Sequence, residues 1–282
     1  IHRYTFDRIK GNIGLGAKRI IRSKRKIEKF FNRNKINSSH IISVGDFEAF
    51  SKNNQERLSY GISVTDFNKD GKFDFIVTGF KFPNLILSHK NGYLENINTN
   101  NLFADQTRST IGVAACDIDN DGFEELYFLN TDTYSGQKQF SDRLLDNNKN
   151  IIDLFQLDKN LRSLNLTAGR SVVCVDRNGD GKYGIYVANY GGPTRFYELK
   201  KGSIVDQAPL LNINRITGGR AVVAGHILSN YMDIFAANER GPNFLYINEN
   251  STFKDVAESL GVEDTFENGR GTTLTDFLYR GK

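Results

Sequence analysis

The sequence of 282 residues lacks the features that mark several common classes of protein. It contains no run of about 18 apolar residues, so no transmembrane helix is predicted. It has two cysteines, Cys116 and Cys174, but no Cys-x-x-Cys pair or Cys/His cluster that would bind zinc. The Gly-x-Ser-x-Gly and His-Glu-x-x-His signatures and the phosphate-binding loop are also missing. Zinc proteases, serine hydrolases and nucleotide-binding proteins are therefore disfavoured.

Three short acidic segments, by contrast, share nearly the same pattern: Asp66–Asp74 (loop 1), Asp117–Glu125 (loop 2) and Asp176–Gly184 (loop 3). Each has oxygen-bearing side chains at positions 1, 3 and 5 and glycine at position 6. Ca²⁺ takes several oxygen ligands at about 2.3–2.6 Å, and glycine permits the sharp bend that folds a loop around the ion. The sequence therefore predicts calcium sites in these loops. The candidate metal residues, position 7 included, are Asp66, Asn68, Asp70, Lys72 and Asp74 in loop 1, Asp117, Asp119, Asp121, Phe123 and Glu125 in loop 2, and Asp176, Asn178, Asp180 and Lys182 in loop 3.

The segments that flank the loops predict strands rather than the helices of an EF-hand. An EF-hand needs a bidentate glutamate at position 12, where this chain has Val77, Phe128 and Val187. The residues on both sides of each loop are rich in β-branched and aromatic types, which favour strands. Each loop is therefore predicted to be the turn of a strand–loop–strand hairpin.

The loops belong to a longer repeat. Position 1 of successive units falls at Asp66, Asp117, Asp176, His226 and Asp276, at intervals of 51, 59, 50 and 50 residues. About 50 residues is the size of one four-stranded propeller blade. We therefore expect an all-β fold, a partial β-propeller of about four four-stranded blades that is cut off in a fifth unit.

The units do not all retain their metal ligands. In the fourth unit the segment from His226 to Asp233 has no run of oxygen-bearing side chains, so no metal is expected there. In the fifth, Leu278 and Arg280 stand where oxygen ligands belong. Loop 3 has Gly184 at position 9, where loops 1 and 2 have carboxylates. Because ligand charge raises Ca²⁺ affinity, we expect loop 2 to bind at least as tightly as loop 1, and loop 3 more weakly.

Several segments spread along the chain also resemble a known family. They are Asn84–Leu87, Ile111–Asp119, Ala168–Arg177, Gly184–Tyr190, Asn238–Tyr246 and Gly269–Gly271. In these segments the chain resembles the FG-GAP/VCBS repeats of integrin-α-type propellers and, more narrowly, the N-terminal part of the cartilage acidic protein family. The resemblance implies a seven-bladed propeller with Ca²⁺ in its blade loops, followed by other modules. It also implies a secreted or surface-associated protein without enzymatic activity.

Both ends of the chain depart from that family pattern. The chain begins with Ile1 and shows no signal sequence, and it ends inside the fifth unit, so we expect a fragment. Three Asn-x-Ser/Thr triplets, at Asn37, Asn165 and Asn250, are compatible with glycosylation and secretion. Chance also supplies such triplets in an asparagine-rich chain.

The net charge of +4 hides an asymmetry between a basic head and an acidic remainder. Residues 1–40 hold twelve Lys and Arg and two acidic residues, which leaves residues 41–282 with a net charge of −6. The head could bind nucleic acid or heparin, or it could be a solvated or frayed helix. We favour the second interpretation, because the rest of the chain is acidic. The predicted organisation is thus a basic, helical or frayed segment 1–40 outside the repeats, a propeller region 41–282, and no nucleic-acid partner.

The two cysteines fall in equivalent strands of neighbouring blades. Cys116 lies one residue before loop 2 and Cys174 lies two residues before loop 3, so their side chains have opposite phases along the strands. On that basis we expect buried free thiols and no bridge between them.

These observations favour a non-enzymatic, calcium-binding extracellular propeller that serves as a scaffold for an extracellular or cell-surface protein partner. The alternative is a propeller-based hydrolase or lyase that uses carboxylates. It is disfavoured because the carboxylates are assigned to metal and the histidines are scattered along the chain. They are His2, His40, His89 and His226. A third hypothesis, a nucleic-acid-binding protein, depends on the basic head alone.

Overall fold

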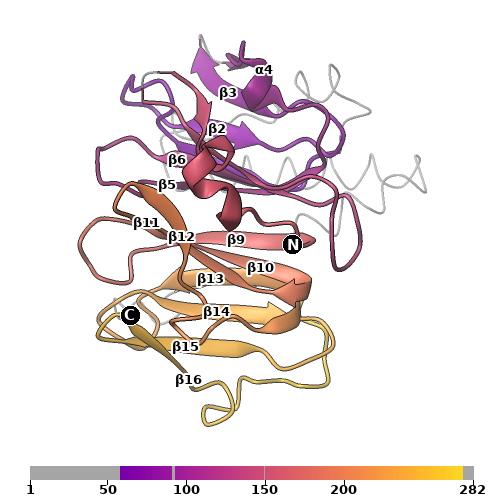
Figure 1. The fold of residues 1–282 in the computed structure, drawn as a ribbon, viewed down its shortest axis with the longest axis vertical. Coiled ribbons are helices and arrows are strands. Elements are labelled where there is room, and N and C mark those ends of the chain that lie inside the picture. Colours follow the sequence, from indigo (N-terminus) through magenta and orange to yellow (C-terminus); the bar gives the residue numbers. More distant parts are fainter. Residues whose placement is uncertain (1–57, 91–92, 149, 276–282) are drawn as a thin grey trace, which may run out of the picture. The chain divides into compact units, whose positions relative to one another are not determined.

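The computed structural model of the chain describes residues 58–275, except residues 91, 92 and 149 (Figure 1). The basic segment 1–40, the start of the predicted propeller region and Asp276 of the fifth unit lie outside the described residues. The described part consists mostly of strands joined by turns and a few short helices. None of its helices is long and apolar enough to cross a membrane.

The strands form four successive antiparallel units of four strands each, which confirms the predicted all-β, partial propeller. Blade 1 consists of β1 (Ile62–Thr65), β2 (Asp74–Val77), β3 (Leu85–Lys90) and β4 (Tyr93–Asn96). Blade 2 consists of β5 (Thr110–Cys116), β6 (Glu125–Asn130), β7 (Arg143–Asp146) and β8 (Ile152–Asp153). Blade 3 consists of β9 (Gly169–Val175), β10 (Gly184–Pro193), β11 (Arg195–Lys200) and β12 (Ser203–Asp206). Blade 4 consists of β13 (Ile216–Gly225), β14 (Asp233–Asn238), β15 (Phe244–Glu249) and β16 (Thr252–Asp255).

Three short helices lie in the connections between blades. They are α4 (Asn101–Ala104), η2 (Leu154–Gln156) and η3 (Asp158–Ser163). The side chain of Asn100 caps α4 by accepting from two backbone amides, as asparagine commonly does at a helix N-terminus.

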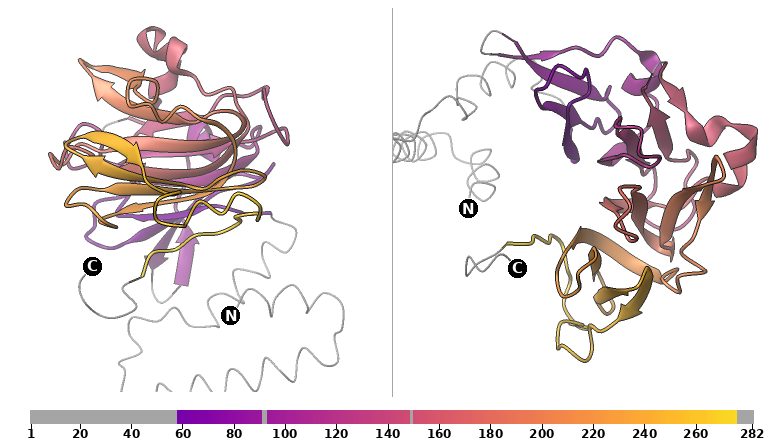
Figure 2. Two further views of the ribbon diagram at one scale, coloured as in Figure 1. Left: turned by 90° about the horizontal axis from the view of Figure 1, so that it is seen from below. Right: turned by 90° about the vertical axis from the view of Figure 1, so that its left-hand side faces the viewer.

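The first strand of each blade lies beside the first strand of the next. β1 contacts β5, β5 contacts β9, and β9 contacts β13. Figure 2 shows the four sheets following one another side by side in chain order. Blades 3 and 4 are also joined by main-chain hydrogen bonds, because the end of β10 pairs with the start of β13. The repeat predicted from the sequence is thus a row of stacked blades.

The core lies between neighbouring sheets and not within any single sheet. One cluster joins blades 1 and 2 around Phe103 and Phe128, whose rings are 5.2 Å apart. A second joins blades 2 and 3 around Tyr127 and Tyr197, and a third joins blades 3 and 4 around Tyr186. A four-stranded sheet cannot bury its apolar side chains alone, so each blade needs its neighbours for stability.

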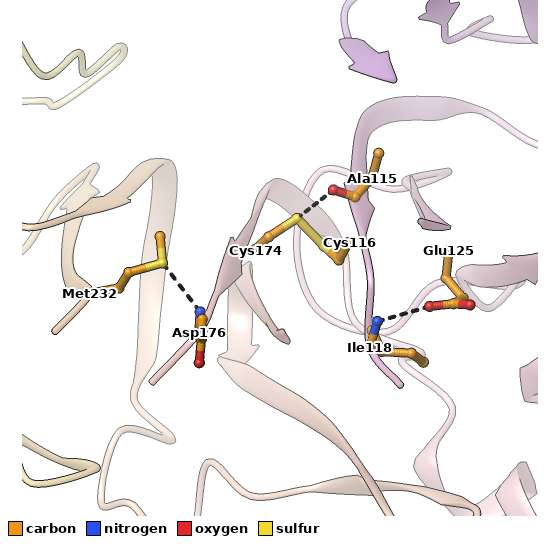
Figure 3. Close-up of a disulfide and its surroundings, with 7 residues drawn as sticks. All are labelled: Ala115, Cys116, Ile118, Glu125, Cys174, Asp176 and Met232. Carbon is orange, nitrogen blue, oxygen red and sulfur yellow. Dashed lines mark hydrogen bonds between the residues drawn. A yellow bond between two sulfur atoms is a disulfide. The ribbon is translucent and has the colours of Figure 1, made fainter. Parts of the chain in front are cut away.

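A disulfide joins Cys116 in β5 to Cys174 in β9, so the prediction of free thiols is wrong (Figure 3). The error lies in how strand phase was interpreted. Neighbouring blades are related by rotation, so each sheet shows one face to the blade before it and the opposite face to the blade after it. Side chains of opposite phase in adjacent first strands therefore point toward each other. Both cysteines pack into the core between blades 2 and 3, with their Cα atoms 5.6 Å apart.

Candidate metal centre

All three acidic loops are turns between the first and second strands of their blades, as predicted. Loop 1 joins β1 to β2, loop 2 joins β5 to β6, and loop 3 joins β9 to β10. In each hairpin the residue before the loop pairs with the residue at position 9, as Cys116 does with Glu125. The loops therefore occupy the same end of successive blades.

The carboxylate at position 1 holds each loop closed. In loop 1, Asp66 accepts hydrogen bonds from the amides of Asp70 at 3.0 Å and Gly71 at 2.9 Å. Asp117 in loop 2 and Asp176 in loop 3 accept from the amides at the same two positions. The glycines at position 6 have φ between +81° and +85°, in the left-handed region that strains other residues. The repeated Asp and Gly are thus explained by loop geometry.

The residues at positions 5 and 7 form a second recurring contact within the loops. In each loop the amide at position 7 donates to the carboxylate at position 5: Lys72 to Asp70 at 2.9 Å, Phe123 to Asp121 at 2.7 Å and Lys182 to Asp180 at 3.0 Å. At position 3, the side-chain oxygens of Asn68 and Asp119 accept from the position-5 amides, and Asn178 is half-buried in its loop. The predicted residues are therefore gathered within each loop, and each carboxylate retains free lone pairs.

Loop 2 brings three carboxylates together. Oxygen atoms of Asp117, Asp119 and Glu125 all lie within 4.8 Å of one another, the one such group of acidic, His or Cys side chains among the described residues. Burial raises the pKa of Glu125 to about 8, against the opposing hydrogen bond from the Ile118 amide, and the charge of Asp119 adds to the rise (Figure 3). Burial and the neighbouring Asp121 likewise raise the pKa of Asp119. This acidic triad could hold a metal ion, which would relieve the repulsion.

Loop 1 contains an unpaired buried oxygen. Asp74 is fully buried, and its Oδ2 accepts from the amides of Phe67 at 3.0 Å and Asn68 at 3.4 Å. Its Oδ1 is buried with no hydrogen-bond partner. An unsatisfied buried acceptor costs about 1–3 kcal/mol, and more when it is charged. A cation bound in the loop would supply the missing partner, so the donor set of loop 1 fits a metal.

Loop 3 lacks this ninth-position oxygen for a steric reason. A Cβ atom on Gly184 would lie 2.7 Å from the ring of Phe196, so no larger side chain fits without a shift. Its donor set is therefore reduced to Asp176, Asn178 and Asp180, together with backbone oxygens.

The fourth unit satisfies its ninth-position carboxylate in another way. Asp233 pairs with Gly225 at the end of its hairpin, the register that Glu125 has with Cys116. Its carboxylate accepts from the Leu228 amide at 2.7 Å and from the Ser229 hydroxyl at 2.6 Å. Burial alone would raise the pKa of Asp233, but these bonds and others from nearby amides lower it. The repeat pattern in the sequence did not reveal this equivalence, because the loop between Gly225 and Asp233 is one residue shorter than the loop between Cys116 and Glu125. That this unit holds no metal stays a prediction.

The acidic loops also contact one another, which the sequence did not reveal. The ammonium of Lys69 in loop 1 donates to the Gly122 carbonyl of loop 2 and lies 4.5 Å from the centre of the Phe123 ring. The amide of Tyr183 in loop 3 donates to the Asp117 carbonyl at 2.9 Å. The three loops therefore form one continuous row.

The stacked four-stranded blades and their acidic hairpin loops define a propeller of the FG-GAP type. The family model described as FG-GAP-like repeat matches residues 66–128, which span loop 1, loop 2 and most of β6. Beyond this class, the chain is similar to cartilage acidic protein 1 of Xenopus tropicalis, with 42% identity over 256 residues. The same protein of Mus musculus and of Homo sapiens is 41% identical over 256 residues. The predicted resemblance to the cartilage acidic protein family is thus confirmed.

These alignments cover only part of the relatives. Each covers 81% of this chain, but 40%, 40% and 39% of the lengths of the Xenopus, mouse and human proteins. Among solved structures, the V. cholerae biofilm matrix protein Bap1 aligns at a TM-score of 0.39 with 19% identity, over 70% of this chain and 30% of that one. BBS1N in complex with ARL6DN aligns at a TM-score of 0.43 with 12% identity, over 68% of this chain and 55% of that one. Scores this low add nothing to the description of the fold.

Proposed function

We propose that this chain is a Ca²⁺-binding, extracellular β-propeller region that acts as a non-enzymatic scaffold for protein partners. The convergence of Asp117, Asp119 and Glu125 at the turn of a repeated hairpin supports the proposal most strongly. The donors in these loops are all oxygens, which suit a hard cation, and Ca²⁺ tolerates the irregular geometry that a flexible loop offers.

The ion would act as a structural clamp. In loop 2 it would be held by the acidic triad, by the carboxylate of Asp121 and by the backbone carbonyl oxygen of Phe123 at position 7. In loop 1 it would be held by the equivalent set, with Asp74 at position 9. Its charge would neutralise carboxylates that now repel one another and would satisfy the free Oδ1 of Asp74. Because such a site exists only in the folded hairpin, binding stabilises the fold.

Two observations support an extracellular setting. The Cys116–Cys174 disulfide is of a kind that persists in oxidising compartments and is rare where thiols are kept reduced. The relatives at 41–42% identity are named cartilage acidic protein 1. In extracellular modules Ca²⁺ is bound with Kd on the order of 10⁻⁴–10⁻³ M, which is the range we expect here.

The non-enzymatic part of the proposal follows from how the acidic side chains are used. The loop carboxylates accept backbone amides and lie at hairpin turns, each loop repeating the arrangement of the last. A catalytic site instead needs different groups converging on one point. Repetition of one arrangement in successive blades favours a structural role.

Thermal unfolding of the chain with Ca²⁺ and with a chelator tests this function. We expect the unfolding temperature to rise as Ca²⁺ is added and to return when the chelator is added in excess, because the ion binds only the folded state. Mg²⁺ at the same concentration serves as the control and should give a smaller rise, since it demands a stricter octahedral geometry. An unfolding temperature that does not change with Ca²⁺ would refute the metal assignment.

A further inference from the structure

Three arginines occupy equivalent positions in successive units: Arg170 near the start of β9, Arg220 within β13, and Arg270 in a segment that forms no strand among the described residues. Arg170, Arg220 and Arg270 each follow a glycine seven residues before position 1 of their units. Arg170 lies at the start of β9, whereas loop 3 follows the end of that strand. In the first two units the same register holds Tyr60 and Ile111. The arginines therefore form a group in adjacent units and are not a general feature of the repeat.

One carboxylate is shared by two of these arginines. Arg220 Nε donates to Glu239 Oε2 at 2.5 Å, and a terminal nitrogen of Arg270 donates to Oε1 at 3.1 Å. The hydroxyl of Tyr134 contacts one of the arginines and the carboxylate: it accepts from Arg220 at 2.9 Å and donates to Glu239 at 3.3 Å. The cluster is thus built to surround a carboxylate with guanidinium and phenol donors.

Two tyrosine rings form a platform for the guanidinium groups. Tyr134 and Tyr190 have ring centres 5.1 Å apart. The Arg170 guanidinium lies 5.4 Å from both centres, and that of Arg220 lies 5.5 Å and 5.1 Å from them. Stacking on aromatic faces holds arginine side chains in fixed orientations, which lowers the entropy lost when they bind a partner.

The cluster retains unused binding capacity. Among the described residues Arg170 forms no ion pair; it donates to Thr131 Oγ1 at 3.0 Å and to backbone carbonyls, and its Nε is buried without a hydrogen-bond partner. The side chain of Arg270 is 68% exposed, and Tyr134 is 60% exposed. The cluster contains three guanidinium groups, two of which pair with its one carboxylate, so it is positive within a region, residues 41–282, whose net charge is −6.

We propose that the cluster of Arg170, Arg220, Arg270, Tyr134 and Tyr190 is a docking surface for an acidic peptide segment of a partner protein. The planar guanidinium matches a carboxylate with two parallel hydrogen bonds, and the internal Glu239 already shows that a carboxylate fits between two of these arginines. Exposed tyrosine and arginine are the residues that most often dominate protein interfaces. The inference rests on the proposed scaffold function and names the chemistry of its partner.

Fluorescence anisotropy with a labelled peptide of alternating Asp and Glu, at about 0.15 M salt, tests the proposal. We expect binding that Arg270→Ala weakens about five-fold or more and that Arg270→Lys only partly restores, because lysine keeps the charge but not the planar fork. Tyr134→Ser should also weaken it. The matched control is Arg162→Ala, which removes an equally charged, exposed side chain from η3 and should leave binding unchanged.

Equal effects of Arg270→Ala and Arg162→Ala, or no peptide binding by the unaltered chain, would overturn the proposal. A heparin oligosaccharide that binds through the same residues more tightly than the peptide would also overturn it, in favour of a sulfated glycan. Unfolding temperatures of the variants identify any loss of folding. We expect none in the Arg270 variants, because this side chain is exposed. Measuring the unfolding temperature of the same samples with Ca²⁺ and with a chelator separates the two proposals. Peptide binding by a chain whose unfolding temperature does not change with Ca²⁺ would refute the metal sites alone.

Discussion

The backbone amide of Tyr183 donates a hydrogen bond to the carbonyl oxygen of Asp117 at 2.9 Å, which joins loop 3 directly to the first residue of loop 2. The two loops belong to different blades, so the order of one affects the order of the other. We expect Asp176→Ala, which removes the carboxylate that closes loop 3, to lower the Ca²⁺ affinity of loop 2 by about two- to five-fold, a coupling of roughly 1 kcal/mol or less.

Isothermal titration with Ca²⁺ measures this coupling. Glu258→Gln, an exposed change far from the loops in sequence, is the control and should leave the affinity unchanged. A loop 2 affinity that is the same in Asp176→Ala and in the unaltered chain would show that the loops bind independently.

The Cys116–Cys174 disulfide closes a segment of 58 residues and should stabilise the fold mainly by restricting the unfolded chain. We expect the double change to serine to lower the free energy of unfolding by roughly 2–4 kcal/mol, as measured by urea denaturation. Reducing the unaltered chain should have the same effect. Mass spectrometry that finds two free thiols in the folded chain would contradict the assignment.

The carboxylate of Asp233 should make stability depend on pH in a definite direction. Its pKa in the folded state is lowered, so it contributes stability above the unfolded value of about 3.9, and this contribution is lost as pH falls through the folded pKa. We expect Asp233→Asn to lower the free energy of unfolding at pH 7 by about 1–3 kcal/mol. The deficit should shrink below about pH 4.

Urea denaturation at a series of pH values checks this expectation, with the exposed Glu258→Gln as the matched loss of one charge. A deficit in Asp233→Asn that is the same well below the unfolded pKa as it is at neutral pH would show that the charge of Asp233 plays no part.

Two of the three Asn-x-Ser/Thr triplets lie in described residues and differ sharply in access. Asn165 is fully buried, and its amide nitrogen donates to Asp142 at 2.6 Å and Asn189 at 3.0 Å. Asn250 is exposed in the turn between β15 and β16. When the chain is passed through a eukaryotic secretory pathway, we expect glycan at Asn250 and none at Asn165. Asn37 lies outside the described residues.

Glycopeptide mass spectrometry before and after deglycosylation separates these sites. The mass lost on deglycosylation should decrease in Asn250→Gln. It should be unchanged in Thr167→Ala, which removes only the Asn165 triplet. Glycan on Asn165 of folded, secreted chain would contradict its buried position.

The sequence was sufficient to predict features that repeat within one blade. Strand–loop–strand hairpins, the spacing of about 50 residues and the carboxylates of loop 2 all follow from local pattern, and the structure shows them where they were expected. These features depend on neighbours a few residues apart. The metal itself and the order of affinities remain predictions.

Features that depend on how one blade faces the next could not be obtained in that way. Cys116 and Cys174 were correctly assigned opposite phases along their strands. Whether opposite phases bring the two side chains together depends on the rotation between blades, which the sequence does not reveal. The contact of Lys69 with loop 2 and the meeting of Arg170 with Tyr134 join residues 53 and 36 positions apart in different blades. Asp233 was overlooked because a shorter loop shifted it by one residue against the repeat.

The central claim is that the acidic loops bind Ca²⁺ in an order set by their carboxylates. The most direct test is calorimetric titration of the unaltered chain, Asp119→Ala and Asp180→Ala with Ca²⁺. Asp119 belongs to the triad of loop 2, whereas Asp180 belongs to loop 3, which lacks an oxygen at position 9. We predict binding by the unaltered chain, a large loss in Asp119→Ala and a smaller loss in Asp180→Ala. No heat of binding, or an equal or reversed order of losses, would contradict the account.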